Sequence, residues 1–282
     1  MMLDINGCAL NVELLGGEDP AKPLLIAHHG APGLGSMEEP RAAFGWLADT
    51  FRVIIFDARG SGKSADVPPY DHDQWVADID ALREWAGAER FVMAGGSYGG
   101  FLSMEYAVRH PERLLALVLR DTAPDATHDN LALENALASD RVDIPEERLA
   151  RMFDGKVLDN DDFRDLWREL LPLYTFTHDP AAIEAKVASV DYHYATHNAA
   201  FSTARETYDV KPHLHRVTCP ALVTVGREDW ITPVVNSEQI AELLPDAELV
   251  IFEESGHSPP LEEPERFQQV VRDFLDRALA RA

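Results

Sequence analysis

Short apolar runs and helical patterns alternate along this chain, and the alternation predicts a sheet of buried strands separated by helices. The runs that predict strands lie at residues 24–28, 52–56, 90–94, 114–119, 221–225 and 248–252. Apolar residues recur at helical spacing between many of them, as in residues 75–85, 101–110, 234–244 and 264–280. Because strands buried on both faces read as continuous apolar runs, we predict an α/β fold: a mostly parallel central sheet with helices on both faces.

The pattern changes near Pro124. From there to about residue 215 the chain is helical in pattern, charged and rich in aromatic residues, with no clear strand. We therefore expect three parts: the first part of an α/β core at residues 1–123, a helical cap at residues 124–215, and the second part of the core at residues 216–282. Open α/β sheets place their sites at the carboxyl edge of the strands, so the cap is expected to cover that edge.

The strong negative charge narrows the choice of partners. The 282 residues carry a formal net charge of −24. So acidic a surface repels phosphate backbones, which argues against nucleic-acid binding and leaves a small-molecule or short-peptide substrate.

The two cysteines, Cys8 and Cys219, form no disulfide framework, which fits a reducing compartment. The start of the chain lacks a signal-peptide pattern, and no apolar run approaches the ~20 residues of a membrane span. We expect a cytoplasmic protein without membrane contact, and the sequence leaves open whether it forms a homo-oligomer.

The strongest chemical signal is the turn Gly95-x-Ser97-x-Gly99, which lies between a predicted strand and a predicted helix. A serine in such a turn takes a strained backbone conformation, so its neighbours must have almost no side chain. The strain exposes the hydroxyl to a base. Ser97 is therefore the predicted nucleophile.

A serine hydroxyl needs a general base, and the base needs a carboxylate that orients it. In this architecture the chain order is serine, then acid, then histidine. Asp229 follows the predicted strand 221–225, and His257 follows the predicted strand 248–252, so both lie at the same sheet edge as Ser97. Glu228 competes with Asp229 as the acid.

Negative charge that develops on a substrate carbonyl requires backbone donors. The N–H group of Tyr98, directly after the nucleophile, is one predicted donor, and that of Ala31, in the loop after the strand 24–28, is the other. This chemistry needs no cofactor or metal, and the histidines of the cap match no common metal spacing. Asp57 and Arg59, in the next loop, are expected to tie that loop to its neighbours.

These motifs resemble the α/β-hydrolase superfamily and, within it, the proline iminopeptidase group of serine peptidases. The matching segments are His29-Gly30-Ala31-Pro32-Gly33, Asp57-Ala58-Arg59-Gly60-Ser61-Gly62-Lys63-Ser64, and Gly95-Gly96-Ser97-Tyr98-Gly99, together with the acid and histidine loops. Ala31 stands where the group has glycine, and Tyr98 where it often has tryptophan. The resemblance covers nearly the whole chain outside the cap.

The resemblance implies where a substrate would bind. In that group, carboxylates of the cap hold the free amino terminus of the substrate. Asp191 resembles the position of one such acid, and Glu206 is a further candidate, although either could be a solvated charge on a helix face. His29, in the oxyanion loop, and Tyr192, in the cap, complete the expected substrate-binding residues.

We therefore expect a serine hydrolase that acts through an acyl-enzyme, most similar to an aminopeptidase or amidase that releases an N-terminal residue. A small-molecule carboxylesterase, lactonase or amidase is the alternative on the same fold. A non-catalytic binding protein that keeps the hydrolase shape is the rival from another class, and the complete set of serine, acid and histidine argues against it.

Overall fold

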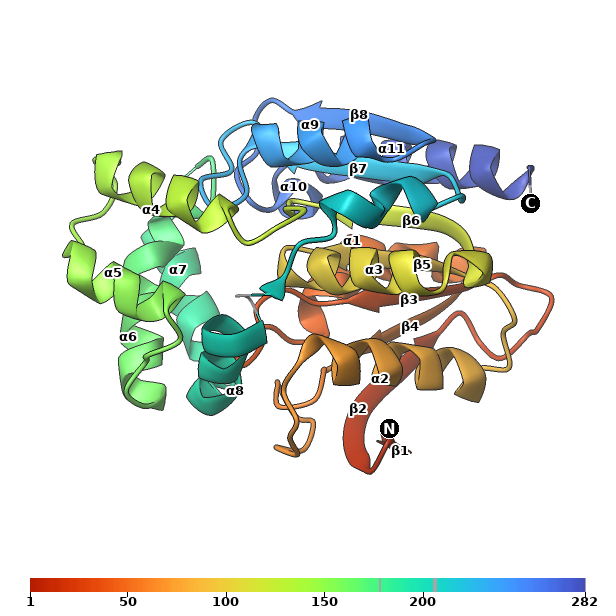
Figure 1. Ribbon diagram of the computed structural model, residues 1–282, viewed down its shortest axis with the longest axis horizontal. Coiled ribbons are helices and arrows are strands. Elements are labelled where there is room, and N and C mark those ends of the chain that lie inside the picture. The colour runs from red at the N-terminus through yellow and green to blue at the C-terminus, as the bar shows by residue number, and fades with distance from the viewer. Residues whose placement is uncertain (178, 205–206, 282) are drawn as a thin grey trace.

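The computed structural model describes residues 1–177, 179–204 and 207–281, and its centre is an eight-stranded sheet (Figure 1). The strand order is β1-β2-β4-β3-β5-β6-β7-β8. The first two strands pair antiparallel to their neighbours, and β4, β3, β5, β6, β7 and β8 are parallel. The strands are β1 (Met2–Ile5), β2 (Cys8–Leu15), β3 (Leu24–His28), β4 (Arg52–Phe56), β5 (Phe91–Gly96), β6 (Leu114–Arg120), β7 (Ala221–Gly226) and β8 (Ala247–Phe252). The predicted α/β fold with a mostly parallel sheet is confirmed.

Helices cover both faces of the sheet. One face carries α2 (His72–Trp85), α3 (Tyr98–Arg109) and α9 (Val234–Leu243), whose apolar side chains share one core cluster with the sheet. The opposite face carries α1 (Glu38–Phe44) and α11 (Pro264–Leu279) over a second cluster. The short helix α10 (Pro259–Glu262) precedes α11. Within the described ranges, every helix is too short or too polar to span a lipid bilayer.

Five further helices lie between β6 and β7 and gather at one end of the molecule (Figure 1). They are α4 (His128–Ala138), α5 (Glu146–Phe153), α6 (Asn160–Leu170), α7 (Pro180–Ala188) and α8 (Tyr194–Ala199). Their apolar faces form a third cluster, around Phe163 and Leu166, which also takes in Leu34 and Trp230 from the two flanking parts of the chain. We call residues 124–215 the cap segment. It has a core of its own and is joined to the rest by shared apolar contacts.

The N-terminal hairpin of β1 and β2 was not predicted from the sequence. Its strands lie at the edge of the sheet, and β2 alternates buried and exposed positions at its start, so it lacks the continuous apolar run of a central strand. The signal that would have found it is the dipeptide Asn6-Gly7, whose residues adopt φ of 50° and 74° in the two-residue turn. This is the backbone that such hairpins require.

The loop after β4 is held by a buried ion pair, as expected for a structural role, but its partners differ from a simple Asp57–Arg59 pair. Arg59 Nε donates to Asp78 Oδ2 of α2 at 2.9 Å, and both side chains are at most 2 % exposed. Asp57 instead accepts from the backbone N–H groups of Met37 and Lys63. The two residues therefore hold different neighbours.

Replacing Asp78 by alanine is expected to destabilise the protein by about 3–5 kcal/mol, because it leaves the Arg59 guanidinium buried without a counter-charge. Urea unfolding followed by circular dichroism measures this change. Glu248→Ala is the matched control: it breaks the exposed pair with Arg277 and should leave the unfolding midpoint nearly unchanged. Equal midpoints for the two variants would contradict the assignment.

Candidate active site

Ser97 stands at the sharp turn between β5 and α3. Its φ of 54° and ψ of −127° lie in a region that non-glycine residues rarely adopt. A side chain at Gly95 would collide with the carbonyl of Gly99, and one at Gly99 would collide with the backbone of His28 and His29. The small neighbours predicted from the sequence are therefore required by packing, and the strained residue is the predicted nucleophile.

His257 and Asp229 meet beside this turn. His257 Nδ1 and Asp229 Oδ2 are 2.9 Å apart, and both residues are almost completely buried. Ser97 and His257 line the same cavity. The structure thus brings together the three residues that the sequence placed on three separate loops.

Asp229 is held by donors on both carboxylate oxygens. Oδ1 accepts the N–H groups of Ile231 and Thr232, and Oδ2 accepts the Thr232 hydroxyl at 2.7 Å. Burial alone would raise the pKa of Asp229, but the charge and hydrogen bond of His257 and the Thr232 donors lower it below its usual value. Glu228 is exposed, so Asp229 is the acid that contacts the histidine.

The pKa of His257 shifts in the direction that suits a base paired with an acid. Burial acts to lower it, but the charge of Asp229 and its hydrogen bond raise the pKa above the usual value, with a further contribution from Asp121. The His257 ring packs edge-on against Tyr174 at a centroid distance of 5.3 Å. Its backbone N–H donates to the Tyr174 carbonyl at 2.9 Å, which fixes the loop.

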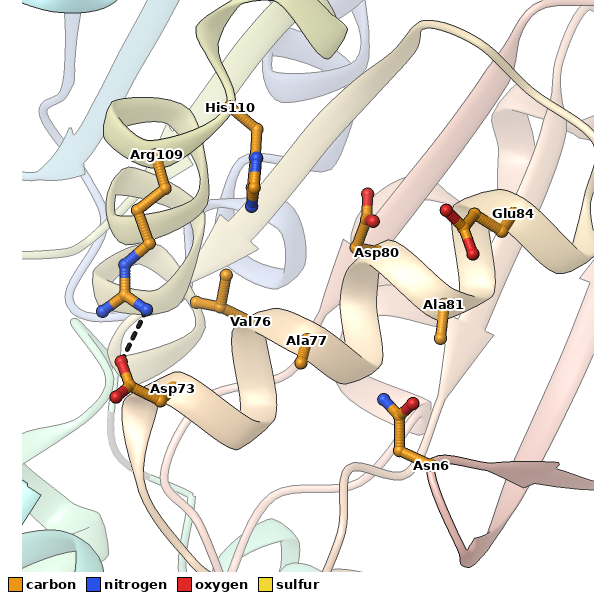
Figure 2. A pocket seen from close by; sticks show the side chains of 9 residues that line it. All are labelled: Asn6, Asp73, Val76, Ala77, Asp80, Ala81, Glu84, Arg109 and His110. Carbon is orange, nitrogen blue, oxygen red and sulfur yellow. Dashed lines mark hydrogen bonds and ion pairs between the residues drawn. The ribbon is translucent and has the colours of Figure 1, made fainter.

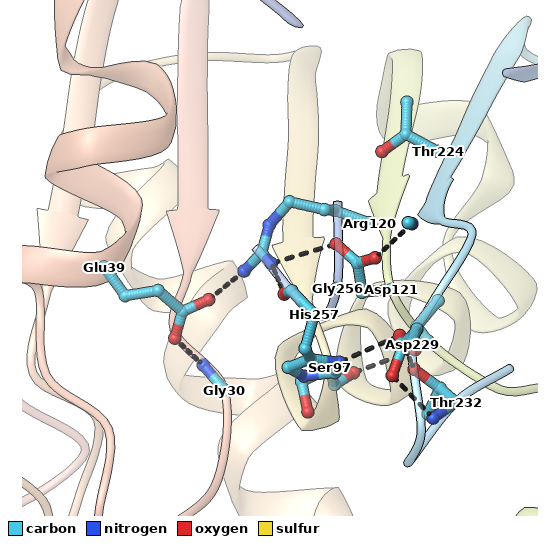
Figure 3. A network of polar contacts seen from close by, with 12 residues as sticks. Gly30, Glu39, Ser97, Arg120, Asp121, Thr224, Asp229, Thr232, Gly256 and His257 are labelled. Atoms are coloured by element: carbon cyan, nitrogen blue, oxygen red, sulfur yellow. Dashed lines mark hydrogen bonds and ion pairs between the residues drawn. The ribbon is translucent and has the colours of Figure 1, made fainter. Parts of the chain in front are cut away.

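A buried arginine connects the loops around the site (Figure 3). Arg120, at the end of β6, donates through Nη1 to the His257 carbonyl at 3.0 Å and to Asp121 Oδ2 at 3.1 Å. Its Nη2 pairs with Glu39 of α1. The other oxygen of Glu39 accepts the Gly30 N–H at 2.7 Å. The oxyanion loop, the end of β6 and the histidine loop therefore share one polar network.

The cavity in front of Ser97 has a volume of about 470 Å³ and lies between the sheet edge and the cap segment. Apolar side chains of the cap segment form one wall: Trp167, Leu171 and Ile183. Charged side chains, Glu38, Glu39, Arg120, Asp179 and Lys186, also line it. The cavity therefore combines an apolar wall with carboxylates.

Three of the four residues expected to bind substrate do not line this cavity. His29 is fully buried, and its ring nitrogens contact the Gly30 carbonyl and the Ala58 N–H, so it supports the loop from within. Tyr192 packs on Phe163 in the cap segment and donates to the Val187 carbonyl. Asp191 is exposed, and neither it nor Tyr192 lines the cavity. The expectation for these three residues is corrected accordingly, and Glu206 lies outside the described residues.

Of the two predicted oxyanion donors, Ala31 lines the cavity. Tyr98 begins α3 directly after Ser97, but its side chain points away into the protein and contacts the ring of His72. Only its backbone can take part in chemistry at the cavity.

The sequence analysis overlooked Glu39, Arg120 and Asp121. A signal for two of them was available: Arg120 and Asp121 come directly after the apolar run of β6, which ends at the same sheet edge as β5. Charged residues at such a strand end are candidates for a site. Glu39 gave no signal, since it lies on a helix rich in charged residues.

A second, shallower cavity of about 300 Å³ lies between α2 and α3 (Figure 2). Asp73, Asp80 and Glu84 line it together with Arg109, which pairs with Asp73. It contains none of the residues predicted for catalysis, so it is not the predicted catalytic site.

Comparison with known proteins agrees with this geometry. A curated relative, proline iminopeptidase PfmaB of Pestalotiopsis fici, is 34% identical over 98% of this chain and 99% of its own length. An esterase from Thermogutta terrifontis superposes with a TM-score of 0.77 at 26% identity, covering 99% of this chain and 98% of its own. An enol-lactonase from Burkholderia xenovorans shares the fold with a TM-score of 0.79 at 21% identity, covering 98% of this chain and all of its own.

The family model described as the alpha/beta hydrolase fold matches residues 23–264, which include the nucleophile turn, the cap segment and the histidine loop. With the strand order and the strained serine turn described above, this chain belongs to the α/β-hydrolase family and is most similar to its proline iminopeptidases.

Proposed function

We propose that the protein is a serine hydrolase in which Ser97, His257 and Asp229 form the catalytic triad. The observation that carries this proposal is the 2.9 Å contact between His257 Nδ1 and Asp229 Oδ2 beside the strained Ser97 turn. The contact leaves the other ring nitrogen of His257 for the serine hydroxyl. Asp229, which is already held by three other hydrogen bonds, fixes the orientation of the imidazole.

In the proposed reaction, Ser97 Oγ attacks the substrate carbonyl while His257 Nε2 takes the hydroxyl proton. The new O–C bond pushes the carbonyl electrons onto its oxygen. Collapse of this intermediate breaks the bond to the leaving group, which receives the proton from His257. Water then attacks the acyl carbonyl while His257 takes one of its protons. The bond from the acyl carbon to Ser97 Oγ breaks, Ser97 Oγ receives the proton from His257, and the carboxylic acid is released.

Backbone N–H groups of Ala31 and Tyr98 stabilise the oxyanion in this proposal. The pattern of the loop supports Ala31. Gly30 N–H donates to Glu39 and Gly33 N–H to Ser61, while Pro32 has no N–H. The N–H groups of Gly30 and Gly33 are therefore used to hold the loop, and Ala31 is the proposed donor of this loop to the oxyanion.

We propose an aminopeptidase-like substrate, a peptide or amide with a free N-terminal residue such as proline. The relative named as a proline iminopeptidase supports this choice. So does Glu39: a methyl group at Gly30 would lie 3.2 Å from both Glu39 Oε2 and Ser97 Cβ, so both atoms border the Gly30 position, and both residues line the cavity. A free amine sits one carbon from the carbonyl that Ser97 attacks, and the Glu39 carboxylate can receive it.

A small-molecule esterase or lactonase is the second candidate. The apolar wall of Trp167, Leu171 and Ile183 favours it, because an uncharged acyl group fits such a surface without any amine contact. The similarity to the esterase of known structure points the same way.

Ser97→Ala is expected to lower kcat at least about a thousandfold, because no other group can form the acyl-enzyme. It should also abolish covalent labelling by a fluorophosphonate probe, which is read by mass spectrometry. Ser103→Ala is the matched control, since Ser103 lies in α3, the helix that follows Ser97, and donates to the Gly99 carbonyl rather than into the cavity. Labelling that survives Ser97→Ala would exclude Ser97 as the nucleophile.

Three chromogenic substrates separate the two candidates. We expect cleavage of proline p-nitroanilide and little cleavage of its N-acetylated form, because acetylation removes the positive charge that Glu39 would receive. p-Nitrophenyl acetate reports the triad alone. An enzyme that cleaves the ester and neither anilide is an esterase, and the aminopeptidase proposal then fails.

Glu39→Gln is expected to lower kcat/KM for proline p-nitroanilide by about tenfold more than for p-nitrophenyl acetate, because one charge-assisted hydrogen bond is lost. The ester measures any disturbance of the Gly30 loop. Asp191→Asn is the matched control and should change neither rate, since that carboxylate is exposed and outside the cavity. A reversed pattern would restore Asp191 as the amine-binding residue.

A further inference from the structure

A second carboxyl group lies beside the proposed acid and base. Asp121 directly follows β6, and its side chain is completely buried. One carboxylate oxygen of Asp121, one of Asp229 and one ring nitrogen of His257 all lie within 4.8 Å of one another. Figure 3 shows the Asp121 carboxyl between Arg120 and the Asp229–His257 pair.

A carboxylate at this position has two unfavourable terms in its free energy: a left-handed backbone and complete burial. Asp121 has φ of 46°, in the left-handed region that asparagine and glycine tolerate better. Its Oδ1 accepts the Gly226 N–H at 2.9 Å, a contact that an asparagine oxygen would make equally well. The other oxygen, Oδ2, accepts from Arg120 Nη1 at 3.1 Å, so the buried guanidinium offsets part of the cost of placing a second charge next to Asp229. The feature that only aspartate supplies here is the negative charge.

We propose that Asp121 is a second carboxyl of the catalytic histidine, a positioning residue that shares with Asp229 the task of stabilising the His257 imidazolium and replaces it in part when Asp229 is removed. This inference rests on the proposed triad. It adds to that triad a group that the sequence analysis did not name, and that follows a different strand from the predicted acid.

The step concerned is the proton transfer that accompanies serine attack. The proton leaves Ser97 Oγ and binds His257 Nε2, so the ring gains a positive charge inside the protein. Asp229 receives the Nδ1 hydrogen, and Asp121 faces the same ring at close range. Two nearby carboxylates stabilise the cation more than one does.

The other charged groups around the ring do not remove this effect. Arg120 opposes it, but the single charge of Arg120 is shared between two carboxylates, Asp121 and Glu39 of α1. From α10, Glu262 accepts the N–H groups of Gly256 and Phe176. Tyr174 contributes an aromatic face.

The titration of Asp121 is consistent with such a role. Burial raises the pKa of Asp121 to about 7, with Arg120 lowering and Asp229 raising it. The Arg120 guanidinium, 3.1 Å from Asp121 Oδ2, acts against this rise in pKa and favours the ionised form on which the proposal depends.

The experiment is the pH profile of kcat/KM for p-nitrophenyl acetate from about pH 5 to about pH 9, measured for the wild-type protein and Asp121→Asn. An ionised neighbour raises the pKa of His257, so removing it lowers that pKa. The acid limb of the profile should move to lower pH by about half a unit or more, and the plateau should fall by about three- to tenfold.

The replacement role is tested in the Asp229→Ala background. There, Asp121→Asn should remove at least about ten times more activity than it does in the wild-type protein, because Asp121 is then the remaining carboxyl. Asp121→Ser serves as a second variant if Asp121→Asn does not fold.

Asp125→Asn is the matched control, since it removes another buried carboxylate of the same loop that pairs with Lys211 instead. Its acid limb should stay in place. An unmoved acid limb in the Asp121 variants, or equal losses in the two backgrounds, overturns the inference. A wild-type protein that neither hydrolyses the ester nor labels with fluorophosphonate overturns the proposed triad instead.

Discussion

The arrangement of the site depends on one buried cation. Arg120 contacts the carbonyl of His257, the carboxyl of Asp121 and the carboxyl of Glu39, which in turn holds the Gly30 N–H. These partners come from the histidine loop, from the residue after β6 and from helix α1, which is joined in turn to the oxyanion loop. A buried guanidinium requires acceptors for its planar set of donors, and its fixed geometry makes those acceptors converge. Convergence of the loops follows from the need to satisfy this charge.

The sheet was predictable because its central strands are buried on both faces. Residues 24–28 and 52–56 are completely apolar except at their ends, and the structure has strands there with the same bounds. A strand that is buried on both faces needs apolar residues at nearly every position, so it can be recognised from its composition alone. The hairpin at residues 2–15 was missed because an edge strand that is partly solvated carries a weaker apolar signal. The Asn6-Gly7 turn is the part of this hairpin that the sequence could have predicted.

The site was predictable only as far as it lies at strand ends. Ser97, Asp229 and His257 follow the parallel strands β5, β7 and β8, so chain order and parallel pairing place them at one edge. The positions of the residues expected to bind substrate cannot be predicted from strand order in this way. Asp191 is exposed and His29 is buried because helix packing in the cap segment and loop packing under the sheet edge decide their directions. Glu39 lies on α1 and reaches the site by pairing with Arg120. This contact is between residues far apart in the chain, so a local sequence pattern cannot predict it.

The cap segment shares its apolar core with two residues next to the chemistry. Trp230 directly follows Asp229, and Leu34 lies in the loop that contains Ala31. A rigid-body movement of the cap segment away from the sheet would therefore also displace the acid loop and the oxyanion loop. Access to Ser97 then requires rearrangement of side chains that line the cavity, such as Lys186 of α7 and Leu261 of α10. Whatever loosens the cap core also loosens the catalytic geometry, so turnover and local stability are linked in this fold.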